Sequence, residues 1–281
     1  MVGVIVINFG NPDRTIRFVQ EECSKIKMEH SVIVVDNGSG PDTVVRLQSE
    51  LKDTATILPN SANEGFARAN NLGAIWLREH VNPGYILFTN NDIRLREDNV
   101  VECLQECISD HPEVAAAGPE IIGPDGCRQG PEPKMSFAQR HLLPYWGKLF
   151  LSSKSFAARI SSNYAQNAIE GWHYRISGAF FLVRADDFYS AGMFDPNTFL
   201  YGEESILSER FAAIDKKVWF CPRVGVFHEH GATTGQWYKY AKVRRLKFKS
   251  ESYYFRRYIG TPLWQIWLGS LTLWIKEIVH R

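Results

Sequence analysis

Several common signatures are missing from the 281-residue sequence. It has five cysteines, an odd number without a Cys-x-x-Cys pair, which argues against a disulfide framework and indicates reduced, structural thiols in a cytosolic compartment. The formal net charge is only +1, so no overall field points to nucleic acid or to an acidic substrate. Internal repeats and low-complexity tracts are absent as well. What remains is the composition of an ordinary soluble globular protein.

Targeting and nucleotide-binding motifs are also missing. The N-terminus, MVGVIVINFGNPD, lacks a basic region and its apolar run ends at Asn8, so we interpret it as a first β-strand and not as a signal peptide. No clean apolar stretch reaches the roughly 20 residues of a spanning helix. The sequence has neither G-x-G-x-x-G after the first strand nor G-x-x-x-x-G-K-[ST], which argues against dinucleotide-binding and P-loop sites.

The first half of the chain alternates β-branched runs with helical patterns. We expect strands at 2–9, 31–35, 54–58, 85–89 and 114–117, with helices at 16–26, 42–51, 64–79 and 99–108. Continuous apolar strands between helices predict a mostly parallel, doubly wound α/β sheet covered on both faces. Residues 119–171 are less regular and predict loops and short helices. Further strands are expected at 174–184, 217–220 and 224–228, with a helix beginning near Gly202.

Polar residues stand where the expected strands end. The first strand ends at Asn8, the second at Asp36, the third runs into PNSANEG, and the fourth ends at Asn90 and Asp92. The carboxyl ends of parallel strands share one edge of a sheet, and ligands of open α/β sheets bind there. The pattern therefore predicts a binding rim.

Two of these strand ends allow a structural and a functional interpretation. Asp36 in VVDNGSG is typical of a turn or a helix cap, but beside a phosphate-sized site it can accept a hydrogen bond from a nucleobase or a ribose. In NSANEG, Asn63 is the expected helix cap and Gly65 a permissive turn residue. The N-terminus of the same helix can also bind an anion.

Candidate metal ligands and a candidate base come from three short motifs. Asn90 and Asp92 are two residues apart and point the same way in an extended segment, where the carboxylate can hold a hard divalent cation. In FHEHG, His228 and His230 share one face of a strand end, and His228 can complete a metal site with Asp92. In GEES, two acids at a helix start either stabilise the helix dipole or supply a general base.

Taken in order, these motifs resemble those of a known family. The series VVDNGSG, NEGFARANN, TNND, ISGAFFLVR, GMFDPNTFLYGEE and FHEHGATTG resembles the family 2 glycosyltransferases, in particular the bacterial rhamnosyltransferase-type enzymes of surface polysaccharide assembly. The resemblance covers about residues 2–258. It implies a GT-A fold, inversion at the sugar carbon, a nucleotide-diphosphate sugar donor and a divalent metal, Mg²⁺ or Mn²⁺.

The resemblance also implies roles for individual residues. Asp36 would contact the nucleobase, Asp92 would bind metal and diphosphate, and His228 would ligate the metal. Either Glu203 or Glu204 would take the acceptor proton, and we favour Glu204. The complete expected site has catalytic residues Glu204 and Glu203; nucleotide-sugar-binding residues Asn8, Asp36, Asn63, Gly65, Asn70, Asn91 and Asp92; metal-binding residues Asp92, His228 and Asn90; and acceptor-side residues Ser177, Gly178 and Ala179.

Two positions depart from the family pattern. Asn90 stands at the first acidic position of the D-x-D element, which weakens the cation site because an amide oxygen is neutral. Glu204 stands where the family has a catalytic Asp, which adds one methylene of reach. Both replacements keep an oxygen donor.

The C-terminal part has a different character. We expect a GT-A domain over residues 1–235 and a basic, aromatic helical extension over 236–281. Its last segment repeats Trp264, Trp267, Leu271, Trp274 and Ile278 at helical spacing, but it is too short and too interrupted to span a bilayer. Beside a basic run it predicts either an interfacial helix on anionic lipid or a helix packed on the domain or on a second subunit of a homodimer. No RNA-binding motif accompanies the basic run, so we expect no nucleic-acid partner.

Together with these patterns, the resemblance implies an inverting, metal-dependent glycosyltransferase, which we expect at the cytoplasmic face of the membrane. Its donor would be dTDP-rhamnose or a UDP-hexose, and its acceptor a lipid-linked saccharide or an oligosaccharide. Two alternatives stay open. A sugar-phosphate nucleotidyltransferase would need a basic, Gly-rich loop after the first strand, and NFGNPD has no basic residue before Arg14. A non-catalytic nucleotide-sugar-binding or assembly protein is suggested by Asn90 and by the pair of glutamates.

Overall fold

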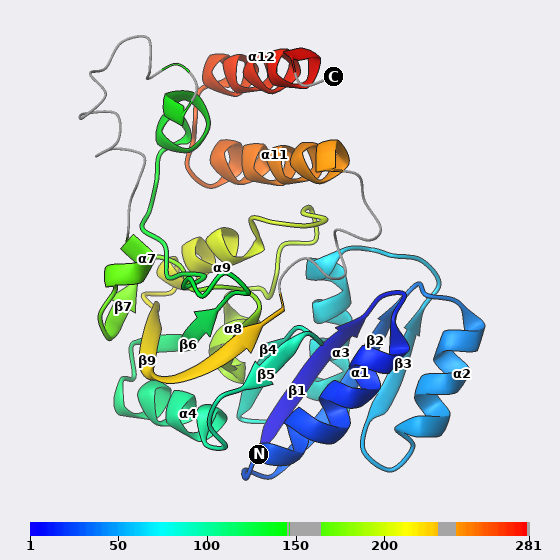
Figure 1. Cartoon of the computed structure of the whole chain (residues 1–281). Coiled ribbons are helices and arrows are strands. Elements are labelled where there is room, and N and C mark those ends of the chain that lie inside the picture. The colour runs from blue at the N-terminus through cyan, green and yellow to red at the C-terminus, as the bar shows by residue number, and fades with distance from the viewer. Residues whose placement is uncertain (145, 147–163, 230–239, 280–281) are drawn as a thin grey trace.

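The computed structural model describes residues 1–144, 146, 164–229 and 240–279 of the chain. Its centre is a nine-stranded sheet in the order β3-β2-β1-β4-β8-β6-β9-β5, with β7 pairing to β9 (Figure 1). The strands are β1 Val2–Asn8, β2 His30–Asn37, β3 Thr56–Asn60, β4 Tyr85–Thr89, β5 Ile93–Leu95, β6 Val114–Ile122, β7 Gly171–His173, β8 Phe180–Arg184 and β9 Lys217–His228.

Helices cover both faces of this sheet. The helices of the described ranges are α1 Pro12–Arg17, α2 Pro41–Glu50, α3 Phe66–His80, α4 Val100–Asp110, α7 Tyr164–Asn167, α8 Ala185–Ser190, α9 Glu203–Ala212, α11 Tyr240–Arg257 and α12 Leu263–Val279, with short helical turns η1 Phe18–Glu22, η2 Cys23–Lys25 and η3 Ala138–Leu142. The sheet is covered by those from α1 to α9, and α11 and α12 lie farther out (Figure 1). Alternate residues of β1 point to opposite faces of the sheet, and each face has its own hydrophobic core. Val4 and Val6 pack with α1, η1, α2 and α4, while Ile5 packs with α3, α8 and α9.

The parallel half follows the predicted alternation of strand and helix. β1 pairs in parallel with β2 and with β4, and β2 pairs in parallel with β3. The register places Asn8 opposite Asp36 and Asn37 opposite Asn60. The polar strand ends therefore lie side by side at one edge, as the sequence predicts.

The other half of the sheet differs in detail from the sequence-based prediction. β8 runs antiparallel between β4 and β6, and β5 and β7 pair antiparallel with β9. The strand expected at 174–184 begins only at Phe180, and the strands expected at 217–220 and 224–228 are one strand, β9, with a register shift. The first helix breaks into α1, η1 and η2. These features depend on pairing between distant segments, which local patterns do not encode.

One predicted helix cap is wrong. α3 begins at Phe66 with Gly65 at the N-cap, and not with Asn63. The Asn63 side chain instead accepts a hydrogen bond from Gly65 N at 2.9 Å, so it stabilises the turn that leads into the helix.

The two C-terminal helices form a layer outside the sheet. α12 is outermost and α11 lies between it and the rest of the molecule (Figure 1). Tyr254 and Phe255 of α11 are buried against Phe137 and Ile206. In the described ranges, no helix combines the length and hydrophobicity that a membrane crossing needs. The expected boundary at 235/236, His230, and the first residues of the basic run lie outside the described residues.

Candidate active site

The first group of predicted residues forms a buried polar network. Asn8 is fully buried at the end of β1 and donates a hydrogen bond through Nδ2 to Asp36 Oδ1 at 2.7 Å. The hydroxyl of Thr15, on α1, donates to Asn8 Oδ1 at 2.7 Å and accepts from Asn91 Nδ2 at 2.8 Å. Asp36 Oδ2 accepts from Ser39 N at 3.0 Å. The network fixes three strand ends against one another.

This network bears on the roles predicted for Asp36 and Asn91. The Asp36 side chain is fully buried, and each of its carboxylate oxygens already accepts one hydrogen bond. A carboxylate oxygen has two lone pairs, so hydrogen-bonding capacity remains, but the carboxylate can meet a base or ribose only if the side chains that cover it move. The amide of Asn91 is directed at Thr15, which makes it a support of the strand ends. Contact of either residue with a nucleotide stays a prediction.

A second group joins the start of α3 to the segment before α9. Gly65 has φ of 86°, and a Cβ atom there would lie 2.2 Å from Phe199 O. Phe66 N donates to that same carbonyl at 2.9 Å. Asn37 Nδ2 donates to Asn63 Oδ1 at 3.0 Å, while Asn70 is buried and donates to Phe66 O within its own helix. Only glycine allows so close an approach of the two segments at position 65.

The third group gathers the candidate metal ligands. His228 Nε2 lies 3.2 Å from Asp92 Oδ1 and 3.2 Å from Asn90 Nδ2. The two residues of the NND segment thus point to the same partner, as their spacing predicts. Asp92 and His228 are 8% and 6% exposed. The antiparallel pair β5–β9, which places Ile93 opposite His228, brings these residues together.

The donor set of this group fits a divalent cation. His228 Nδ1 lies 2.6 Å from Gln129 Oε1 and, because an amide oxygen only accepts, Nδ1 carries the proton. The other ring nitrogen, Nε2, faces Asp92 Oδ1 at 3.2 Å, and it can ligate a cation when it carries no proton. Imidazole nitrogen and carboxylate oxygen are both ligands of Mn²⁺-type ions.

The fourth group contains the two candidate bases at the start of α9. Glu203 is 3% exposed, and burial, followed by the charge of Glu204, raises its pKa well above the usual value. Within the described part of the chain its Oε1 has no hydrogen-bond partner. Glu204 is more accessible: its Oε1 accepts from Gly178 N at 3.3 Å, and its Oε2 lies 3.9 Å from Arg175 Nη1. Glu204 is therefore the glutamate that a substrate can reach as a carboxylate.

Gly178 and Ala179 connect the candidate base with the candidate metal ligands. A Cβ atom at Gly178 would lie 2.6 Å from Glu204 Oε1, so glycine makes room for that carboxylate. The next carbonyl, Ala179 O, accepts a hydrogen bond from Asn90 N at 2.9 Å. Two consecutive residues before β8 thus contact both groups. Ser177 lies beside them and is half-buried.

Four residues at this site have no signal in the sequence patterns. Thr15 links the strand ends, and Gln129 accepts a hydrogen bond from His228 Nδ1. Arg175 faces Glu204. Arg14 Nη1 lies 4.0 Å from Asp92 Oδ2. None of the four stands directly at the end of a predicted strand. Gln129 is 99 residues from its partner. Only the fold brings them to the site.

Solved structures share this fold. The structure of GalNAc-T7 with UDP, GalNAc and Mn²⁺ aligns with a TM-score of 0.60 and 14% identity, over 82% of this chain and 44% of that one. The mannosyltransferase PcManGT from Pyrobaculum calidifontis, in complex with GDP-Man and Mn²⁺, aligns with a TM-score of 0.59 and 15% identity, over 93% of this chain and 64% of that one. This chain therefore spans less than two thirds of either structure. With the mixed sheet, these likenesses define a GT-A fold, which confirms the predicted fold class.

The chain belongs to glycosyl transferase family 2, whose model matches residues 3–188. It is also 24% identical over 254 residues to the N-acetylglucosaminyl-diphospho-decaprenol L-rhamnosyltransferase of Mycobacterium tuberculosis, in strains CDC 1551 and H37Rv. That alignment covers 84% of this chain and 78% of the relative. The predicted family, and the resemblance to rhamnosyltransferases, are confirmed. The protein is a glycosyltransferase.

Proposed function

We propose that this protein is an inverting, metal-dependent glycosyltransferase that moves rhamnose or another hexose from a dTDP- or UDP-sugar to a lipid-linked or oligosaccharide acceptor in bacterial surface polysaccharide synthesis. One observation carries the proposal: Gly178 and Ala179 contact both Glu204 and the group made of Asn90, Asp92 and His228. A base and a cation site adjoining one short segment is the arrangement that displacement at an activated sugar needs.

The donor side of the proposal rests on the polar strand ends. Asp92 and His228 would hold Mg²⁺ or Mn²⁺, whereas Asn90, whose Nδ2 lies 3.2 Å from His228 Nε2, would have to turn its amide over to add an oxygen ligand. When bound, the cation supplies positive charge that stabilises the departing nucleoside diphosphate. Arg14, 4.0 Å from Asp92, adds a second positive charge on that side. The neighbours solved with UDP or GDP-Man and Mn²⁺ support a donor of this chemical class.

The acceptor side of the proposal rests on Glu204. Its carboxylate takes the proton of an acceptor hydroxyl as the oxygen of that hydroxyl forms a bond to the anomeric carbon. The bond between this carbon and the diphosphate oxygen breaks in the same displacement, which inverts the centre without a covalent enzyme intermediate. Arg175 and Gly178 N keep the carboxylate in place through its two oxygens. Glu203 is not suited to this role, because its side chain is almost completely buried.

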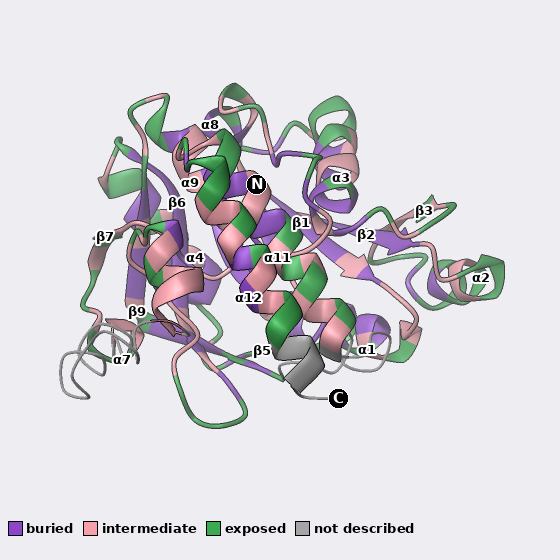
Figure 2. Ribbon diagram, turned by 90° about the horizontal axis from the view of Figure 1, so that it is seen from above, coloured by how far each residue is buried: buried purple, intermediate pink, exposed green. Residues whose placement is uncertain are grey.

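The outer face of α12 supports a lipid-linked acceptor at a membrane surface. Leu263, Trp264, Trp267 and Trp274 are at least 60% exposed and share one side of the helix. The opposite side is small and polar, with Gly269 against Phe137 and Thr272 accepting from Trp146 Nε1. Gly269 and Thr272 therefore face the rest of the molecule and the tryptophans face outwards. Figure 2 shows exposed stretches along α12 on its outer side. Exposed tryptophans beside a basic helix suit the interface of an anionic bilayer.

The membrane contact is tested by vesicle binding. Burial of one large apolar side chain contributes roughly 1.5–3 kcal/mol, so Trp267→Ala should weaken partitioning to vesicles that contain anionic phospholipid by about tenfold or more. Trp172→Ala is the matched control, because Trp172 is 66% exposed on β7. Equal partitioning of both variants would rule out α12 as the contact.

The donor site is tested by calorimetry with dTDP and with UDP, each with and without Mn²⁺. We expect binding that needs the metal and is lost in Asp92→Ala but kept in Asp53→Ala, a change at an exposed turn. The preferred nucleotide then identifies the donor class. Absence of binding to both nucleotides at millimolar concentration, with metal present, would exclude the proposed donor site.

A non-catalytic binding protein is distinguished by turnover. Loss of a general base typically costs 10²- to 10⁴-fold in rate, so Glu204→Gln should lose transfer to that extent while its nucleotide affinity stays unchanged. A wild-type protein that binds the donor but transfers no sugar to any prenyl-diphosphate-linked acceptor would favour the binding protein.

A further inference from the structure

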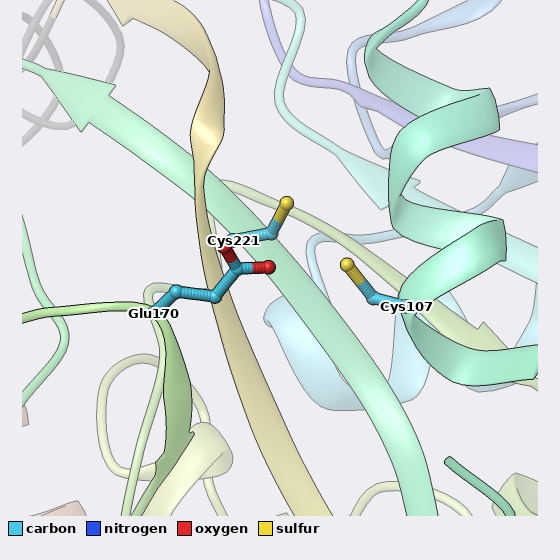
Figure 3. Close-up of side chains that lie close together, drawn as sticks. All are labelled: Cys107, Glu170 and Cys221. Atoms are coloured by element: carbon cyan, nitrogen blue, oxygen red, sulfur yellow. The ribbon is translucent and has the colours of Figure 1, made fainter. Parts of the chain in front are cut away.

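Three metal-ligating side chains converge at a place that the proposed reaction does not use. Cys107 lies near the end of α4, Cys221 lies in β9, and Glu170 comes just before β7. One ligating atom from each, two sulfurs and a carboxylate oxygen, lie within 4.8 Å of one another. Figure 3 shows the three side chains pointing toward a common centre from separate elements. Both cysteines are buried, while Glu170 is exposed and leaves a route from solvent.

The cluster already pairs with a positive charge. Arg223 donates through Nη2 to Cys107 Sγ at 3.1 Å and through Nε to Glu170 Oε1 at 2.9 Å. The side chain of Arg223 is 51% exposed, so it can move into solvent. A hydrogen bond from Cys107 lowers the pKa of the Cys221 thiol to about 7, and the same bond raises that of Cys107. A thiolate beside a carboxylate is stable only with a cation nearby.

The position of the cluster in the fold gives a bound ion a structural effect. β9 is irregular here, because Cys221 pairs with Pro119 while Gly225 pairs with Glu120, the next residue of β6. Residues 222–224 therefore stand outside the regular register. The same strand continues to His228 at the candidate active site. An ion held by Cys107, Glu170 and Cys221 would tie this irregular stretch to α4 and to the segment before β7.

We propose that Cys107, Glu170 and Cys221 form a binding site for one thiophilic divalent cation, Zn²⁺ foremost, separate from the hard-cation site at Asp92. Thiolates select zinc over magnesium or manganese, and three protein ligands plus water complete a tetrahedral zinc site. Ligand atoms around tetrahedral zinc stand roughly 3.5–4 Å apart, which is compatible with three atoms that all lie within 4.8 Å of one another. Binding displaces the Arg223 guanidinium to solvent and releases the protons of the two thiols, which makes affinity rise with pH.

Cobalt is the probe that reports thiolate ligands directly. The reduced full-length protein is titrated with Co²⁺ in excess Mg²⁺, which occupies the hard site. We expect a thiolate-to-cobalt charge-transfer band that saturates at one ion per chain and is abolished by Zn²⁺. The band should be lost in Cys107→Ser and in Cys221→Ser and kept in Cys127→Ser, which changes an exposed cysteine outside the cluster.

Two surface variants keep the test decisive where a buried Cys→Ser change prevents folding. Glu170→Gln should weaken Co²⁺ binding by at least about tenfold, the loss typical of even an outer partner of a metal site. Arg223→Gln should tighten it, because a competing positive charge is removed. Zn²⁺ at about 100 times its Kd should raise the Tm of the wild type by roughly 5 °C, and should do so in Asp92→Ala as well.

Three results would overturn the proposal. The first is a wild-type protein with five titratable thiols and no charge-transfer band. The second is a band that survives in Cys107→Ser or Glu170→Gln but disappears in Cys127→Ser. The third is a count of three thiols in the protein as isolated, with Cys107 and Cys221 joined as a disulfide that reforms in air in preference to metal binding.

Discussion

Gln129 accepts a hydrogen bond from His228 Nδ1 at 2.6 Å and is half-buried in the segment after β6. At the scale of single residues, this contact decides which imidazole nitrogen can face Asp92. Partners of this kind hold a metal-binding histidine in one tautomer and orientation, and their loss commonly costs 10- to 100-fold in metal affinity. Gln129 is thus a positioning residue for the proposed cation site.

We predict that Gln129→Ala weakens Mn²⁺-dependent dTDP or UDP binding by about 10- to 100-fold and leaves the metal-independent component unchanged. Gln129→Glu keeps an acceptor for Nδ1–H and should restore most of the affinity. Calorimetry over a range of Mn²⁺ concentrations measures both effects. Gln105→Ala, on the distant helix α4, is the control, and an equal metal dependence in Gln105→Ala and Gln129→Ala would contradict the role.

Gly178 provides the second test at the residue scale. A Cβ atom there would lie 2.6 Å from Glu204 Oε1, so Gly178→Ala should displace the carboxylate. A displacement of about 1 Å of a reacting group can cost roughly 10²-fold in rate. We expect kcat to fall by that order while the donor KM changes little. Gly84→Ala is the matched control, because open space surrounds its Cβ position. A fall in donor affinity without a fall in kcat would show that Gly178 acts elsewhere.

At the scale of elements, the start of α3 depends on contact with a distant segment. Gly65 and Gly40 are both N-cap residues with left-handed φ, 86° and 101°. The Cβ position of Gly65 meets Phe199 O at 2.2 Å, whereas that of Gly40 has nothing within 4 Å. Both positions have a positive φ, but only Gly65 also has a close steric contact. Comparing substitutions at the two positions therefore distinguishes backbone strain from steric contact.

We predict that Gly40→Ala costs about 1–3 kcal/mol of unfolding free energy, from the strain of a positive φ combined with an extended ψ. Gly65→Ala should cost a further 1–3 kcal/mol or so, because the turn before α3 and the Phe199 segment must move apart. Urea unfolding measures both values. If the two variants lose the same stability, the close approach at Phe199 contributes nothing.

Some strands of the sheet could be predicted from sequence patterns and others could not. The strands around Asn8, Asp36 and Thr89 were predicted because buried parallel strands are continuous apolar runs with polar ends. β5 and β7 were not, because three-residue strands have no periodicity of their own and form only where β9 offers a partner. β9 is one strand, but the sequence analysis predicted two, because Pro222 and Arg223 interrupt the apolar pattern. The pairing with β6 continues on either side of these residues.

At the scale of the whole molecule, a chain of charges connects the C-terminal helices with the candidate base. Glu251 on α11 pairs with Arg140 at 2.6 Å, Arg140 pairs with Glu132 at 2.9 Å, and Arg175 pairs with both Glu132 and Glu204. The network passes from the outer helical layer through η3 to α9. α11 is therefore joined to the rest of the molecule by ion pairs as well as by the aromatic cluster around Phe137.

This network predicts a pH dependence of stability. Burial of Glu251 opposes its ionisation, but the contact of Oε2 with His141 Nε2 at 3.2 Å and the charge of Arg140 outweigh burial and lower the pKa from 4.5 to about 2. The folded state therefore binds fewer protons than the unfolded state. The stabilisation is complete above pH about 4.5 and is lost as the pH falls towards 2; a shift of this size corresponds to about 3 kcal/mol.

We expect the unfolding free energy of the wild type to fall between about pH 4.5 and pH 2. Glu251→Gln should be less stable at pH 7 and should show a shallower fall across that range. Glu79→Gln, at an exposed helix position, is the control and should follow the wild type. Parallel curves for the wild type and Glu251→Gln would mean that acid acts on other groups.

The sequence by itself determined the parallel half of the sheet, the rim of polar strand ends, and the family of the protein. Each of these depends on local patterns: hydrophobic period, polar residues after apolar runs, and short motifs in order. It also marked Asp92, His228 and the two glutamates as candidates, because carboxylate and imidazole groups at element ends are visible in one dimension.

Only the tertiary structure decided which of these groups lie close together, and which neighbouring side chains hold them in place. Burial separates Glu203 from Glu204, although the two are adjacent in sequence. Pairing of β5 with β9 brings Asp92 to His228, and the approach of three separate segments joins Cys107, Glu170 and Cys221. Exposure, tautomer and proximity depend on contacts between residues tens of positions apart, and these arise only when the whole chain has packed.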